Sequence, residues 1–109
     1  MKPSEQYDAA WTLANDAVDY VEARSWRVRW LGGSWAEHMT HELALAMVLC
    51  RGRFTQQTDR SRLEATMQTW LRDQTAHYDV AIRWIARMLI PIIVRLVLDW
   101  WLARRNQAA

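Results

Sequence analysis

Apolar residues in the first part of the chain recur with the spacing of a helix. Between residues 4 and 23 they stand three and four positions apart, at Tyr7, Trp11, Ala14, Val18 and Val21. This spacing places them along one helical face. Pro3 and Ser4 provide a typical start. The pattern predicts an amphipathic helix over about residues 4–30, in which residues 25–31 form either the last turns or an extended connector.

A second helical pattern begins at Ser34. Glu37 stands three positions later, which is the spacing of a capping box. From there to Arg51 apolar residues occur on almost every side of the helix, so a helix here needs to be buried centrally. Gly52 then supplies a typical end. We therefore predict a second helix over about residues 34–51.

Helical periodicity continues after a polar loop, from about residue 58 to about residue 105, and Pro91 is the one interruption. A straight helix of this length would span roughly 65 Å, which two shorter helices cannot cover. Pro91 is therefore expected to kink or split it. The sequence predicts an all-α fold, a small helical bundle of two shorter helices (about 4–30 and 34–51) and one long, Pro91-kinked third helix (about 58–105).

The length and composition fit this fold. A chain of 109 residues forms one domain at most. Three glycines and two prolines are too few for the many tight turns of a β-sandwich or barrel. We expect residues 1–79 to form the body of the bundle. Residues 80–109 are expected to form a strongly apolar amphipathic helix, either within the same domain or as an overhanging arm.

The segment from residue 80 to residue 102 has the most informative pattern. Its four charged residues and Pro91 recur every fourth position, which makes one slanting stripe on an otherwise apolar helix. A narrow charged stripe beside a wide apolar arc, with tryptophans near both ends, indicates a surface that other molecules cover. The predicted partner- or membrane-binding residues are Arg83, Trp84, Arg87, Arg95, Asp99, Trp100 and Trp101.

Two functions follow from this segment. The favoured one is a non-enzymatic structural or assembly subunit of a larger homo- or hetero-oligomeric particle, such as a bacteriophage virion, whose C-terminal helix mediates packing. The alternative is a membrane-associated protein that uses the 80–102 helix as an interfacial or transmembrane anchor. Arg87 and Arg95 disfavour a lone span, because each costs ~2.5–3.5 kcal/mol near the bilayer centre. A third arrangement folds the helix back into the core of a monomer.

Tryptophan and arginine dominate the unusual composition. The chain has eight tryptophans, and all but one of its 14 basic residues are arginine. The net charge of +2 is too small to indicate a partner by itself. Arginines near the second loop could bind nucleic acid. The twelve acids and the lack of a recognised nucleic-acid module disfavour such binding. These arginines are Arg51, Arg53, Arg60 and Arg62.

Candidate chemistry is sparse. His38 stands one helical turn before His41 and Glu42, so the three could share a face, and His77 could join them. Their spacing matches no established zinc or di-iron motif. We assign no catalytic residue, metal ligand or cofactor. The single Cys50 excludes an internal disulfide and favours a reducing intracellular compartment or a virion. Residues 1–23 contain five acids and no apolar core, so secretion by a signal peptide is not expected.

Overall fold

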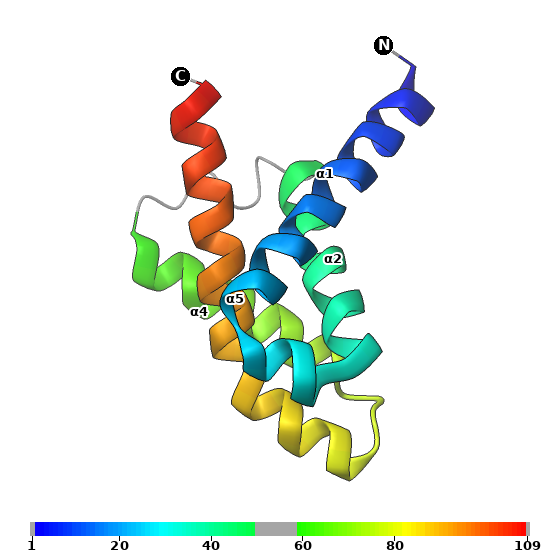
Figure 1. Cartoon of the computed structure of the whole chain (residues 1–109), viewed down its shortest axis with the longest axis vertical. Helices are drawn as coiled ribbons and strands as arrows, with labels where there is room; N and C mark the ends of the chain where they lie inside the picture. Colours follow the sequence, from blue (N-terminus) through cyan, green and yellow to red (C-terminus); the bar gives the residue numbers. More distant parts are fainter. Residues whose placement is uncertain (1, 50–58, 109) are drawn as a thin grey trace.

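The computed structural model describes residues 2–49 and 59–108, nearly all of them in helices. In chain order these are α1 (Pro3–Arg24), the π-helical turn η1 (Val28–Gly32), α2 (Gly33–Leu49), α4 (Arg60–Gln74) and α5 (Val80–Ala108). Helix α1 packs mainly on α2, and α5 packs on α4, α1 and α2 (Figure 1). No strand occurs among the described residues, so the predicted all-α bundle is confirmed.

Helix α2 occupies the centre of the bundle. All the other helices contact it. Its buried residues point in several directions, as expected for a helix that is apolar nearly all round. They are Ala36, Met39, Thr40, His41, Leu43, Ala44, Leu45 and Met47. The predicted central burial of this helix is therefore confirmed.

The buried face of α1 is rotated from the predicted one. Ala14 and Val21 are buried as expected, but the side chains of Tyr7 and Trp11 are 46% and 45% exposed. Small residues occupy the contact with α2, namely Ala10, Ala14, Ala17 and Val21. Short side chains let two helices approach closely, and the large rings lie at the edge of the contact. Periodicity alone did not distinguish this alanine face from the adjoining aromatic one.

The segment after α1 is helical and leads into α2, so the extended connector is wrong. Helix α1 ends at Arg24, and helical structure resumes at Trp26. Ser25 is buried, and its Oγ accepts a hydrogen bond of 3.3 Å from the backbone N–H of Val28. Ser25 thus caps the new helical segment. Ser34 lies inside the helix, so the cap predicted there is also wrong.

Two glycines join η1 to α2 instead of ending a helix. A Cβ at Gly32 would lie 2.4 Å from the Cβ of Ala36, so no larger residue fits there without a shift of the backbone. Gly33 has a φ of +56°, which favours glycine. The π-helical turn therefore depends on both glycines.

The predicted long third helix is two helices, and they separate at residues 75–79 rather than at Pro91. Thr75 ends α4, because its amide donates to the carbonyl of Leu71 and its hydroxyl donates to that of Arg72. Thr, His, Tyr and Asp in this turn are weak helix formers. Because the chain reverses at this turn, α4 packs against α5. The other helices therefore do not have to cover one straight helix of that length. Pro91 lies inside α5, where buried residues on both sides hold the helix in place.

The two halves of α5 have different environments. Residues 80–85 are largely exposed, whereas the inner face from Ala86 onward is buried. Trp100 and Trp101, two of the predicted partner- or membrane-binding residues, are only 4% and 8% exposed and pack within the chain. The alternative in which the helix folds back into the core of the chain holds for residues 86–101. The exposed end of α5 is its N-terminal end, because the turn at 75–79 directs the rest of the helix back along α4.

Candidate functional site

The three residues considered as metal ligands on α2 do not converge. His41 is buried against α1, where its Nε2 lies 3.3 Å from the carbonyl oxygen of Trp11 and its ring lies 4.1 Å from the Trp11 ring. His38 is exposed on the side of α2 that faces α4. Among the described residues, no group of three His, Cys, Asp or Glu side chains could hold a metal ion. Cys50 lies outside the described residues.

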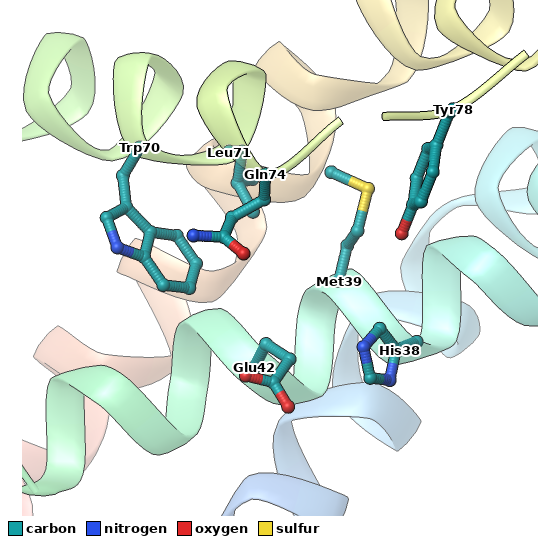
Figure 2. Close-up of a pocket in the computed structure, with 7 residues that line it drawn as sticks. All are labelled: His38, Met39, Glu42, Trp70, Leu71, Gln74 and Tyr78. Atoms are coloured by element: carbon teal, nitrogen blue, oxygen red, sulfur yellow. The ribbon is translucent and has the colours of Figure 1, made fainter. Parts of the chain in front are cut away.

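A small cavity separates α2 from α4 and the turn that follows it. Figure 2 shows Met39 of α2 extending toward α4, with His38 and Glu42 on the adjoining turns of α2. The cavity has a volume of about 230 Å³, and its lining residues are His38, Met39, Glu42, Trp70, Leu71, Gln74 and Tyr78. No serine, cysteine or lysine lines it, and its titratable lining side chains are His38, Glu42 and Tyr78. The exposed His77 is not among the lining residues.

The charged stripe on α5 is divided between different environments. Asp99 pairs with Arg60 of α4, and Arg60 also pairs with Glu64. These two carboxylates raise the pKa of Arg60 above its ordinary value, chiefly through the hydrogen bond to Asp99. Among the ion pairs of the described residues, Asp99 is paired with Arg60 and not with Arg95. Arg62 is exposed, and Arg51 and Arg53 lie outside the described residues.

Three well-exposed tryptophans belong to two segments that lie in the half of the bundle away from both termini (Figure 1). Trp26 and Trp30 belong to the segment before α2, and Trp84 belongs to the start of α5; the three side chains are 59%, 74% and 68% exposed. Helix α5 and η1 contact each other, and Leu89 of α5 lies beside Gly32. Leu31, Val80 and Met88 on the same two segments are also exposed. With Arg24, Arg27, Arg29, Arg83, Arg87 and Arg95, these residues make up what we call the tryptophan–arginine surface.

The charge of this surface is of one sign. The segments 24–31 and 80–98 contain six arginines and no acid. The ion pairs among the described residues involve Arg60 and Arg104, so the six arginines of the surface are free of them. Two of these arginines lie near tryptophan rings, since the guanidinium of Arg27 is 5.5 Å from the Trp26 ring centroid and that of Arg29 is 5.8 Å from the Trp30 centroid.

The sequence pattern identified only part of this surface. Arg83, Trp84, Arg87 and Arg95 are exposed, as a binding role requires. Trp26 and Trp30 were absent from the predicted set, because residues 25–31 were assigned either to the last turns of a helix or to an extended connector. Their spacing of four residues was the available signal, since it places both rings on one side of a helix.

Two carboxylates meet close to this surface. The side chain of Glu22 on α1 shares a hydrogen bond with that of Glu37 on α2, which raises the pKa of Glu22 above its ordinary value of 4.5. Partial burial and the nearby negative charges raise the pKa further, and Arg29 lowers it. A raised pKa in the folded state means that the contact stabilises the fold at low pH and loses this effect as pH rises through the pKa of Glu22.

We therefore expect Glu37→Gln to stabilise the protein at neutral pH. The amide removes the like charge but retains a hydrogen-bonding group, and the gain should stay below about 1 kcal/mol because the pair is largely solvated. Urea denaturation at pH 5 and pH 8 measures this effect. The variant should lose less stability between the two pH values than the wild type does. Asp8→Asn, which neutralises an exposed acid elsewhere on α1, should leave that difference unchanged; an equal effect of both substitutions would contradict the pairing.

No protein-family model matches the chain, and neither a curated protein nor a solved structure is detectably similar to it. Within the described residues, no helix has both the length and the apolar character required to cross a membrane. Function is therefore inferred from the surface and its chemistry alone.

Proposed function

We propose that this protein is a non-enzymatic, membrane-associated protein that binds the face of an anionic bilayer through the tryptophan–arginine surface. The observation that carries the proposal is the set of exposed tryptophans and unpaired arginines on residues 24–31 and 80–95. Tryptophan is favoured at the level of the lipid headgroups, where an apolar ring and a polar N–H both find partners. Arginine is favoured beside the phosphates of the same layer.

The distribution of residues on α5 also supports interfacial binding. The part of the helix rich in leucine and isoleucine packs within the chain, and the part that remains exposed carries Trp84, Met88 and two arginines. Shallow binding needs only such a limited apolar ridge with basic residues around it. The wide apolar arc that favoured assembly in the sequence is now largely accounted for by contacts inside the bundle.

A second function, the assembly subunit of a larger particle, is favoured by a different feature. The first half of α1 exposes Tyr7 and Trp11 beside Glu5 and Asp8. This aromatic and acidic edge has the opposite charge to the tryptophan–arginine surface, so one copy could bind the next head to tail. A symmetric dimer through the arginines themselves is disfavoured, because it would bring like charges together.

Flotation with lipid vesicles distinguishes these functions. We expect the purified protein to float with vesicles that contain phosphatidylglycerol and to float much less with vesicles of phosphatidylcholine alone, and added salt should weaken the binding. Light scattering of the same sample in the absence of lipid should report a monomer. A protein that stays at the bottom of both gradients would overturn the membrane proposal. An oligomer in that case would support the assembly function instead.

A further inference from the structure

A groove beside Trp26 brings arginines from two parts of the chain together. One wall is the end of α1 and the residues that follow it, and the other is the middle of α5. The groove has a volume of about 310 Å³, and its lining residues are Arg24, Ser25, Trp26, Arg27, Ile92, Arg95 and Leu96. We call it the arginine groove. It overlaps the tryptophan–arginine surface, because Arg24, Trp26, Arg27 and Arg95 belong to both.

Aromatic rings rather than acids hold two of these arginines. The guanidinium of Arg24 lies 3.6 Å from the centroid of the Tyr20 ring, and its Nη1 donates to the Tyr20 carbonyl at 3.5 Å. Arg27 lies by the ring of Trp26. No carboxylate lines the groove, and none of its three arginines forms an ion pair with a described residue. Their N–H groups therefore remain available to an anion.

The residues that line the groove favour a phosphate ester over a small inorganic anion. Guanidinium groups pair well with phosphate oxygens, often through two parallel hydrogen bonds. Ile92 and Leu96 of α5 add an apolar side to the groove. A small inorganic anion would use the arginines alone, whereas a phosphate ester that carries hydrocarbon next to its charge would use both kinds of lining.

We propose that the arginine groove is a binding site for the phosphate of a phospholipid headgroup, with Arg24, Arg27 and Arg95 on the phosphate and Ile92 and Leu96 against the adjoining glycerol and acyl carbons. The inference rests on the proposed membrane function and adds a defined lipid site to it. Binding here would fix how the protein lies on the bilayer, because Trp26 at the edge of the groove enters the same headgroup layer.

Matched pairs of arginine substitutions test the site. Arg24→Gln with Arg95→Gln removes two charges from the groove, and Arg83→Gln with Arg87→Gln removes two charges from the same surface outside it. All four side chains are exposed, so both variants should fold, which circular dichroism would check. If the arginines act only by general attraction to anionic lipid, each arginine removed should lower the affinity about fivefold, in either pair. A phosphate site predicts a loss for the groove pair that is roughly tenfold larger than for the outside pair.

These outcomes separate the site from the proposed function. If the wild-type protein floats and both pairs weaken binding equally, the lipid site is overturned and the membrane function stands. If the wild-type protein does not float, the membrane function itself fails. A larger loss for the groove pair supports the site.

Soluble probes then identify the source of the phosphate. In NMR spectra of the arginine side chains, short-chain phosphatidylglycerol below its critical micelle concentration should shift the side-chain N–H resonances of Arg24 and Arg95. Inorganic phosphate should do so only at much higher concentration. Equal responses to the two probes would overturn the lipid assignment in favour of a soluble phosphate, and no response to either would overturn the site.

Discussion

Replacement of Leu98 with alanine is expected to lower the free energy of unfolding by about 2–5 kcal/mol. Leu98 lies in the second half of α5, and its side chain is fully buried in the core. The smaller side chain loses apolar contact and leaves a cavity that the surrounding residues fill only in part. Domains of this kind are usually stable by about 5–15 kcal/mol, so the loss should be a large fraction of the total. Urea denaturation followed by circular dichroism measures it.

Met88→Ala on the same helix is the matched control. Met88 is 61% exposed, and its truncation should change the free energy of unfolding by less than about 0.5 kcal/mol. The contrast tests the division of α5 into an exposed beginning and a buried remainder. Equal and small effects at the two positions would mean that the second half of α5 does not fold back into the core.

The double substitution Trp30→Ala and Trp84→Ala is expected to abolish most vesicle binding while leaving the fold intact. Both rings are more than two-thirds exposed, so the protein interior does not depend on them. If about half of each ring's area enters the headgroup layer, its loss costs on the order of 2 kcal/mol, and the two losses together reduce affinity roughly a thousandfold. Vesicle flotation at several lipid concentrations measures this reduction.

Tyr7→Ala provides the control for this second experiment. Tyr7 is also a well-exposed aromatic residue, but it lies near the N-terminus, at the end of the bundle away from the tryptophan–arginine surface (Figure 1). Its removal should leave vesicle binding unchanged. A comparable loss of binding from Tyr7→Ala would show that exposed aromatic residues bind lipid wherever they lie, and would contradict a defined binding surface.

The helical character of the chain could be predicted, because period-3.6 patterns are strong over most of its length. The break at residues 75–79 could not, since it contains neither glycine nor proline and is marked only by the hydrogen bonds of Thr75 to the carbonyls of Leu71 and Arg72. The sequence placed the expected kink or break at Pro91, but the helix continues through Pro91. A proline within a helix is tolerated where burial on either side, as at Ile90 and Ile93, holds the helix together.

Only part of the candidate surface could be predicted from the sequence. Spacing on α5 located Arg83, Trp84, Arg87 and Arg95 on one side of a helix, and these residues are exposed. It also assigned Trp100 and Trp101 to a partner, because a chain of this size has little core to spare for large rings. The reversal between α4 and α5 creates that core. The contribution of Trp26 depends on contact between segments far apart in the sequence, which local periodicity does not reveal.

Quenching of tryptophan fluorescence by brominated lipid tests most directly whether the tryptophan–arginine surface meets the bilayer. The comparison is between the wild-type protein and a variant with Trp26→Phe, Trp30→Phe and Trp84→Phe, which keeps apolar rings at the surface and leaves only the other tryptophans to emit. Both proteins should float with anionic vesicles. We expect strong quenching of the wild-type protein and little quenching of the variant. Equal fractional quenching of the two proteins would show that other tryptophans enter the bilayer and would contradict the proposed mode of binding.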